Sequence, residues 1–293
     1  MQPRFGTMQT PINININGVI TALQDAKISV LDHGLLFGDS VYETLRTYGG
    51  KPFLFSRHFA RLEHSADAIN LKLPWSKSKT LAEIRKTCLA GECRIRLVIT
   101  RGIGDVSATT KTCVGPTVII IVVPLADPDK RIYTDGVEVV ISSIKRSGRL
   151  ADVKTGSLIH QVLARQEADS KNAYEAVLLT ADEKLSDGIT SNIYLVRGGK
   201  ILTPSHDAGI VEGITRGVVL NLAREIGLEA VEGIFDVGEI DRADEMFLTS
   251  STREVVPITR ANGSTVGNGK PGPVTLMLLK AYRSALDQLI LED

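Results

Sequence analysis

The chain has 293 residues, of which 43% are hydrophobic, and its 34 basic and 34 acidic residues give a formal net charge of zero. This length predicts two domains rather than one hydrophobic core, and the even charge argues against nucleic acid or an anionic membrane as the main partner. The three cysteines and five histidines lack the spacing of a disulfide framework or a metal site, so no metal is expected.

The N-terminal segment over residues 1–10 holds one arginine and no apolar core of the kind that a signal peptide needs. No later segment is apolar over the length of a membrane span. We therefore expect a soluble protein of a reducing cytoplasm.

The first half of the chain has the pattern of a sheet with helices. Alternating and β-rich runs predict strands over 12–20, with an Asn17-Gly18 hairpin turn, and over 27–31, 94–100 and 117–123. The run over 117–123 is apolar on both faces, so it is expected to be buried on both. Apolar residues at helical spacing predict a helix over 58–71.

Residues 125–136 are rich in Asp, Pro and Lys and are predicted to link a first domain, 1–124, to a second, 137–293. The second domain is expected to mix strands and helices. The strands are predicted over 137–144, 175–180, 192–196, 200–203 and 245–248, and the helices over 158–170, after Thr215 as far as Gly227, and over 273–290.

The stretch from Ser186 to Arg216 carries the strongest motif. An acidic turn, Asp187-Gly188, leads into an Asn-led strand, then Ile-Leu-Thr-Pro, then a helix start of sequence Val-Glu-Gly-Ile-Thr-Arg. The free N–H groups and the dipole of such a helix start make a phosphate site. An ordinary capped helix has the same local sequence, so this fragment alone leaves both interpretations open.

Three other motifs are equally ambiguous when taken alone. Lys154 lies in Ala-Asp-Val-Lys-Thr-Gly-Ser, Arg61 lies in His-Phe-Ala-Arg-Leu, and a hydroxyl cluster follows a strand at Thr249-Ser250-Ser251-Thr252. Solvated surface cations and a polar loop are the plain interpretations.

In this order, together with the run Asp32-His33-Gly34 to Leu45-Arg46, the motifs resemble the fold-type IV pyridoxal 5'-phosphate enzymes, which comprise branched-chain aminotransferases, D-amino-acid aminotransferases and aminodeoxychorismate lyases. The resemblance spans roughly 17–257. It implies a two-domain α/β (α+β) fold with a smaller N-terminal α/β domain and a larger C-terminal domain with a β-barrel-like core. It also implies a homodimer or higher homo-oligomer, whose site lies near the domain boundary and is completed by a neighbouring subunit.

The resemblance gives each matching residue a role. Lys154 would hold the cofactor as a Schiff base and then act as general base on the substrate Cα–H. Asp187 would pair with the pyridine nitrogen, where the family usually has Glu, one methylene longer. The phosphate would be bound by Arg61, Ile214, Thr215, Ser251 and Thr252.

Substrate residues are suggested in the first domain. Phe37 and Tyr42 fall where the family's aromatic residues line the pocket, although core aromatics would look the same. Arg96 and Arg101 share one strand, and Arg101 in Thr-Arg-Gly resembles the carboxylate-binding arginine of the D-amino-acid enzymes, while lyases carry a similar motif. The branched-chain Gly-Asn-Tyr and Tyr-x-Arg-Pro motifs are not intact here.

Three functions follow as hypotheses. The first is an aminotransferase that moves an amino group from a branched-chain L- or a D-amino acid to a 2-oxo acid such as 2-oxoglutarate or pyruvate, and Glu43 after Tyr42 favours it. The second is an aminodeoxychorismate lyase, which needs no amino acceptor. The third is a cofactor-binding or regulatory protein that has lost catalysis, suggested by Asp187 in place of Glu.

Overall fold

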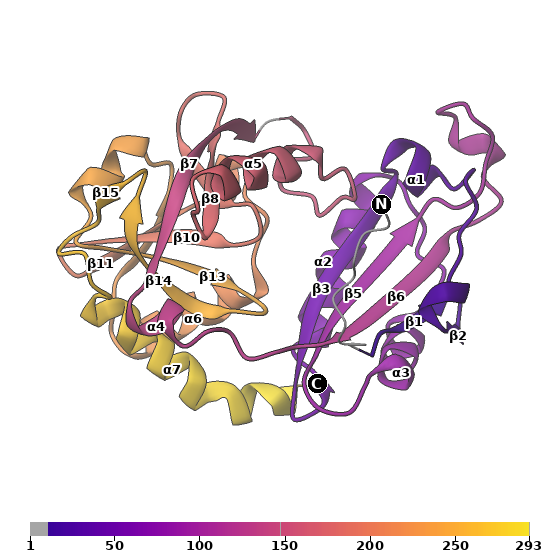
Figure 1. The fold of residues 1–293 in the computed structure, drawn as a ribbon, viewed down its shortest axis with the longest axis horizontal. Coiled ribbons are helices and arrows are strands. Elements are labelled where there is room, and N and C mark those ends of the chain that lie inside the picture. The colour runs from indigo at the N-terminus through magenta and orange to yellow at the C-terminus, as the bar shows by residue number, and fades with distance from the viewer. Residues whose placement is uncertain (1–10, 147, 293) are drawn as a thin grey trace. The chain divides into compact units, whose positions relative to one another are not determined.

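The computed structural model describes residues 11–146 and 148–292 (Figure 1). The chain divides between Asp127 and Pro128 into two compact units, a division that falls inside the segment 125–136. Among the helices described, none combines the length and the apolar character needed to cross a membrane.

The first unit is an antiparallel sheet of six strands in the order β2-β1-β6-β5-β3-β4. Helices α2 and α3 pack on it through β3, β1 and β6. The elements are β1 (Asn13–Ile16), β2 (Val19–Thr21), η1 (Leu23–Asp25), α1 (His33–Phe37), β3 (Ser40–Tyr48), β4 (Lys51–Pro52), α2 (Phe55–Ala68), α3 (Lys77–Thr87), β5 (Cys93–Thr100), η2 (Thr110–Thr112) and β6 (Thr117–Pro124).

The core of the first unit joins the apolar stripe of α2 to one face of this sheet. Phe59 and Leu62 of α2 belong to the same buried cluster as Leu97 of β5 and Ile120 of β6. This packing explains the helical spacing of the apolar residues in α2, because the opposite face of the helix is polar and exposed.

Two expectations for the first unit were wrong. Residues 27–31 form no strand, because alternation alone does not supply a hydrogen-bonding neighbour. Strand β6 is buried on one face, with Ile120 at 0% exposure, while Ile119 and Ile121 on the other face are only partly buried.

The second unit is built on a sheet of nine strands, ordered β12-β11-β10-β13-β14-β7-β8-β9, with β15 paired to β14. Parallel pairs join β7 to β8 and to β14, and the sheet curls (Figure 1). Its elements are α4 (Arg131–Thr134), β7 (Val137–Arg146), α5 (Ile159–Ser170), β8 (Glu175–Thr180), β9 (Leu185–Gly188), β10 (Asn192–Arg197), β11 (Lys200–Pro204), η3 (His206–Ala208), α6 (Ile214–Glu225), β12 (Ala230–Gly233), η4 (Val237–Arg242), β13 (Glu245–Ser250), β14 (Glu254–Ala261), β15 (Ser264–Thr265), α7 (Pro273–Leu289) and η5 (Ile290–Glu292).

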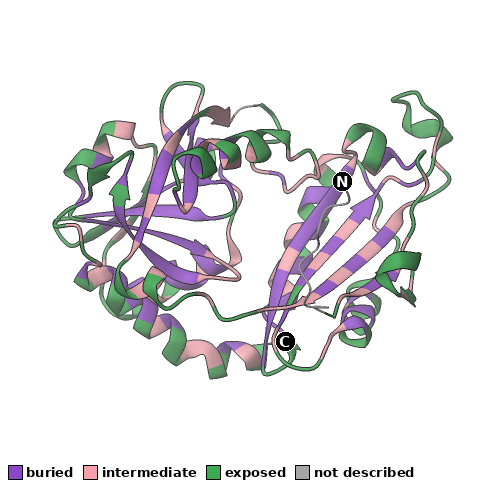
Figure 2. Cartoon of the chain, in the orientation of Figure 1, coloured by how far each residue is buried: buried purple, intermediate pink, exposed green. Residues whose placement is uncertain are grey.

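Burial in the second unit follows the sheet (Figure 2). Strands β8, β10 and β13 are buried along nearly their whole length, while α5 and α7 turn exposed faces outward. Asp187, expected in a turn, is instead the third residue of β9. That strand is short and polar, and its pairing with β8 defines it as a strand, so local sequence could not predict it.

Candidate functional site

Three chain segments of the second unit meet at Asn192. This residue opens β10 and pairs in register with Thr249 of β13. Its side-chain amide donates to the carbonyl of Val211 at 2.9 Å. Gly213 lies so close that a Cβ there would stand 2.0 Å from Asn192 Oδ1, so glycine is required. The start of α6, the end of β13 and the start of β10 are therefore neighbours.

Asp187 adds the end of β9 to this cluster. Its Oδ2 accepts the backbone N–H of Val211 at 3.1 Å, and its Oδ1 lies 3.2 Å from Nη1 of Arg146. The residue is only 4% exposed, yet Oδ1 accepts no hydrogen bond from any residue that the structure describes. A buried carboxylate oxygen in this state is costly unless a donor completes it.

Burial raises the pKa of Asp187, and the charges of Arg146 and Lys154 together with the Val211 N–H oppose the rise. Arg146 is fixed by the carbonyls of Ala151 and Gly209. A second cation placed against Oδ1 would favour the ionised form of this carboxylate.

Lys154 lies in the loop between β7 and α5, next to the buried Val153. It is itself half-buried, and its charge is close enough to Asp187 to lower the pKa of that carboxyl. The predicted lysine and the predicted acid are thus electrostatic neighbours within one unit.

Helix α6 presents its N-terminus at the same place. Its N-cap residue is Gly213, which has no side chain that could occupy the N–H groups of the first turn. Ile214 and the buried Thr215 are its first two residues. Backbone donors, a hydroxyl and the positive end of a helix dipole are groups that favour a bound anion.

The predicted hydroxyl pair, Ser251 and Thr252, lies in the turn between β13 and β14, and both residues are half-buried. Strand β13 brings this turn to the cluster, because Thr249 is the register partner of Asn192. Glu254, which ends the turn, has a φ of 60°, a strained value for a residue other than glycine.

Arg61 belongs to the first unit, on α2. Its Nε and Nη2 donate to the two carboxylate oxygens of Glu43 at 2.7 Å each, and His58 Nδ1 lies 2.8 Å from Glu43 Oε2. Burial alone would raise the pKa of Glu43, but the charges of Arg61 and His58 outweigh it and hold that pKa far below its usual range. The guanidinium of Arg61 is therefore oriented by a buried carboxylate.

The predicted substrate residues differ in their contacts, since Arg96 lies against Tyr42 whereas Arg101 pairs with a carboxylate. The guanidinium of Arg96 lies over the ring of Tyr42, 3.5 Å from its centroid, and donates to Thr44 at 3.4 Å. Among the described residues, Arg96 has no carboxylate partner. Phe37 ends α1 and is 41% exposed.

Arg101 is placed differently. It forms a two-pronged ion pair with Asp39, at 2.9 and 3.0 Å, and donates to the carbonyls of Ile69 and Asn70. These four bonds engage the guanidinium in joining β5 to the end of α2. Arg101 is thus oriented by a carboxylate, as Arg61 is by Glu43.

The second-unit cluster comprises Lys154, Asp187, Asn192, the α6 N-terminus and the Ser251–Thr252 turn. Sequence reasoning missed three residues around it, which are Arg146, Glu175 and Arg253. Arg146 ends a strand and belongs to no motif. Glu175 did carry a signal, since it opens the otherwise apolar run Glu-Ala-Val-Leu-Leu and is 1% exposed. A charged residue inside a buried strand needs a partner, and Arg253 is that partner.

Comparison with known proteins places this geometry in a family. The model of the amino-transferase class IV family matches residues 40–261. The chain is 33% identical to a putative branched-chain-amino-acid aminotransferase of Methanocaldococcus jannaschii, covering 93% of this chain and 96% of the relative. It is 32% identical to a D-alanine aminotransferase of Bacillus licheniformis, covering 96% and 98%, and 31% identical to an aminodeoxychorismate lyase of Bacillus subtilis, covering 95% and 96%.

Solved structures agree with these relatives. The branched-chain amino acid aminotransferase of Escherichia coli superposes with a TM-score of 0.87 at 27% identity, covering 94% of each chain. Another branched-chain amino acid aminotransferase, solved with pyridoxamine 5'-phosphate, gives a TM-score of 0.88 at the same identity and coverage. The predicted fold class is thereby confirmed. The chain belongs to the class IV aminotransferases and is a transaminase of this pyridoxal-phosphate-dependent family.

Proposed function

We propose that this enzyme moves an amino group between an amino acid and a 2-oxo acid at the cluster of Lys154, Asp187, the α6 N-terminus and the Ser251–Thr252 turn. The observation that carries the proposal is the buried Oδ1 of Asp187, which accepts no hydrogen bond from the described residues. A protonated pyridine nitrogen is the kind of donor that would complete it.

The residues present fit pyridoxal 5'-phosphate at both ends. The α6 N-terminus, Thr215, Ser251 and Thr252 supply the donors that a phosphate dianion needs. Arg61 is our proposed further phosphate ligand, supported by its motif and by the carboxylate of Glu43, which fixes the guanidinium plane. When bound, the cofactor supplies an electron-accepting ring.

The proton step falls to Lys154. Its Nζ is the proposed base that takes the proton from the substrate Cα, for which the amine must be neutral. Arg146 and Asp187 set the charge around it. Asp187, if ionised against the ring nitrogen, keeps that nitrogen protonated while the Cα–H bond breaks.

The proposed substrate residues are Phe37, Tyr42, Arg96 and Arg101. Burial lowers the pKa of Arg96, and a substrate carboxylate would compensate the cost of that burial. The proposed donors are a branched-chain L-amino acid or a D-amino acid, with 2-oxoglutarate or pyruvate as acceptor. A homodimer or higher homo-oligomer in the cytoplasm completes the proposal.

The second candidate is an aminodeoxychorismate lyase. The observation that keeps it is the similar identity to the lyase of Bacillus subtilis, at 31% against 32% and 33% for the aminotransferases. A lyase would release pyruvate from aminodeoxychorismate with no amino acceptor present.

The test is the visible absorption spectrum of the purified protein, recorded before and after separate additions of L-leucine and D-alanine without an acceptor. Loss of the bound-cofactor band with one of them supports transamination and identifies the enantiomer. A yellow protein that ignores both but releases pyruvate from aminodeoxychorismate is a lyase. A colourless protein that does not take up added pyridoxal 5'-phosphate contradicts both.

A further inference from the structure

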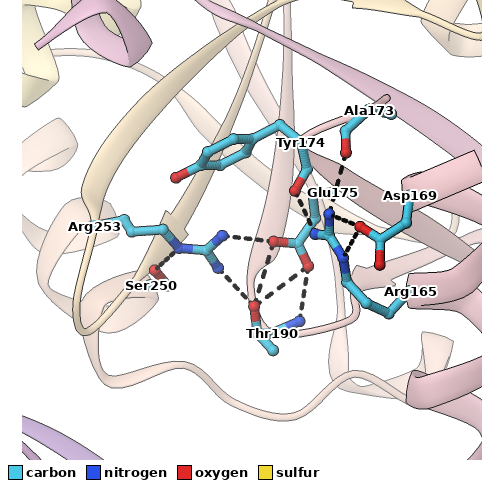
Figure 3. A network of polar contacts seen from close by, with 8 residues as sticks. All are labelled: Arg165, Asp169, Ala173, Tyr174, Glu175, Thr190, Ser250 and Arg253. Carbon is cyan, nitrogen blue, oxygen red and sulfur yellow. Dashed lines mark hydrogen bonds and ion pairs between the residues drawn. The ribbon is translucent and has the colours of Figure 1, made fainter. Parts of the chain in front are cut away.

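Arg253 joins the two turns that surround the second-unit cluster (Figure 3). Its Nη1 donates to Glu175 Oε2 at 2.7 Å, its Nη2 to Thr190 Oγ1 at 2.6 Å and its Nε to Ser250 Oγ at 3.0 Å. Thr190 follows β9, and Ser250 directly precedes Ser251. One planar guanidinium therefore bridges the turn after β9 and the hydroxyl turn after β13.

Glu175 anchors this bridge to the sheet. It opens β8 and is 1% exposed. Besides Arg253 it accepts the backbone N–H of Thr190 at 2.9 Å and the Thr190 hydroxyl at 3.3 Å. A buried carboxylate on a strand that is paired on both sides moves little, so the groups bonded to it are held in place.

The hydroxyl turn needs such a restraint. Glu254, the residue after Arg253, has a φ of 60°, and strained backbone persists only where its surroundings fix it. Two further contacts secure the same turn, since Tyr133 donates to the carbonyl of Arg253 at 3.1 Å and Arg283 of α7 donates to Glu254 at 2.7 Å.

We propose that Arg253, held by Glu175, is a positioning residue that fixes the Ser251–Thr252 turn where it binds the cofactor phosphate. The inference rests on the proposed function, because it assumes that this turn is a phosphate ligand. Glu175 balances the charge of Arg253, so the arginine acts through the position of the turn and not through attraction of the dianion.

Two ligands separate this role from general loss of structure. Pyridoxal 5'-phosphate uses the turn, whereas pyridoxal has no phosphate and does not. In the apoprotein, Arg253→Met is expected to raise the dissociation constant of pyridoxal 5'-phosphate by about tenfold to a hundredfold, the range known for residues that support metal ligands. The dissociation constant of pyridoxal is expected to rise by less than about twofold.

Arg165 provides the matched control, since it lies in the same view (Figure 3). It pairs with Asp169 and donates to the carbonyls of Ala173 and Tyr174, but it has no bond to Thr190 or Ser250. Arg165→Met is expected to leave both dissociation constants unchanged within about twofold.

Two more variants cover the case in which Arg253→Met does not fold. Arg253→Lys keeps the charge near Glu175 but loses the fork, so it is expected to fold and still bind the phosphate form more weakly. Arg253→Met combined with Glu175→Gln leaves no buried charge without its partner. It is expected to bind no more weakly than Arg253→Met alone, because both changes break one clamp.

The readouts are dissociation constants from absorbance titrations of apoprotein, together with thermal melting of each variant. Equal affinity of Arg253→Met, Arg253→Lys and wild type for pyridoxal 5'-phosphate would overturn the inference, and so would equal weakening of both ligands. A wild-type apoprotein that binds neither ligand would instead overturn the proposed function, which separates the two failures.

Discussion

Two buried carboxylates, one in each unit, have opposite electrostatics. Glu43 is 1% exposed and Asp187 is 4% exposed, so burial acts on both alike. Glu43 faces Arg61 and His58 at hydrogen-bonding distance, and its pKa is far below normal. Asp187 faces Arg146 at 3.2 Å with one oxygen that accepts no hydrogen bond within the described structure, and its pKa is raised.

The contrast is between a carboxylate with partners at both oxygens and one with an oxygen that accepts no hydrogen bond, as expected where a ligand binds. Glu43 contacts both His58 and Arg61 at hydrogen-bonding distance, and this carboxylate orients the Arg61 guanidinium. Burial raises the pKa of Asp187, and the charges of Arg146 and Lys154 offset that rise only in part. A cationic ring nitrogen would supply what is missing.

The largest expected effect comes from removing the lysine near the Asp187 carboxylate. Lys154→Ala should lose covalent cofactor attachment and about 10²–10⁴-fold of kcat, since the base is lost. Mass spectrometry after borohydride reduction and a steady-state assay would measure the two losses. Ordinary turnover in this variant would contradict the assignment of Lys154.

Replacing each carboxylate by its amide tests the comparison of Glu43 with Asp187 most directly. Glu43→Gln leaves Arg61 and His58 buried against a neutral amide, so the free energy of unfolding of the first unit should fall by about 3 kcal/mol. The single tryptophan, Trp75, packs on the core of this unit. Urea unfolding followed by its fluorescence therefore reports on that unit.

Asp187→Asn is the paired control, and its urea unfolding is followed by far-UV circular dichroism because Trp75 reports on the first unit. Arg146 retains the carbonyls of Ala151 and Gly209, and one poorly satisfied charge is removed. We expect a stability loss of no more than about 1 kcal/mol in the apoprotein. Equal losses in the two variants would show that the two carboxylates are equally well paired.

The pH dependence sharpens the same contrast. Because its pKa is lowered in the folded protein, Glu43 contributes stability that is complete above the unfolded glutamate pKa of about 4.3 and is lost as the pH falls below it. Asp187 has a raised pKa, so its burial cost appears as the pH rises above the unfolded aspartate value of about 3.9.

The stability difference between wild type and Glu43→Gln should therefore shrink between pH 5 and pH 3, about the range that spans these unfolded values. Urea titrations with Trp75 fluorescence at each pH would measure it. A difference that stays constant over this range would mean that Glu43 is not the titrating group.

The contrast also separates what the sequence could and could not predict. Strand β8 was predictable from its short apolar run, and helix α7 from apolar residues at helical spacing. Strand β9 was not, because Leu-Ser-Asp-Gly becomes a strand only by pairing with β8. A motif pointed to Asp187 and Arg61.

No motif pointed to the pairs Arg146–Asp187 and Arg253–Glu175. The second pair joins residues 78 positions apart in the chain, and the strand register sets such a meeting rather than local spacing. The departure from the family at Asp187 was visible in the sequence, but its consequence depends on Arg146, which only the fold places there.

The smallest expected effect tests whether side-chain length matters equally in the two regions. Asp187→Glu introduces the residue that the family usually has at this position, with a side chain one methylene longer. We expect kcat to stay within about threefold of wild type or to rise, with overpacking costing about 1–3 kcal/mol of stability.

The reverse change in the first unit is its control. Glu43→Asp shortens the side chain that spans the contacts with Arg61 and His58, both at 2.7 to 2.8 Å. A shorter carboxylate cannot reach both, so stability of the first unit should fall. A collapse of kcat in Asp187→Glu would instead mean that Arg146 and Val211 define a pocket for the shorter acid. The cofactor site of this chain would then be fitted to the shorter side chain.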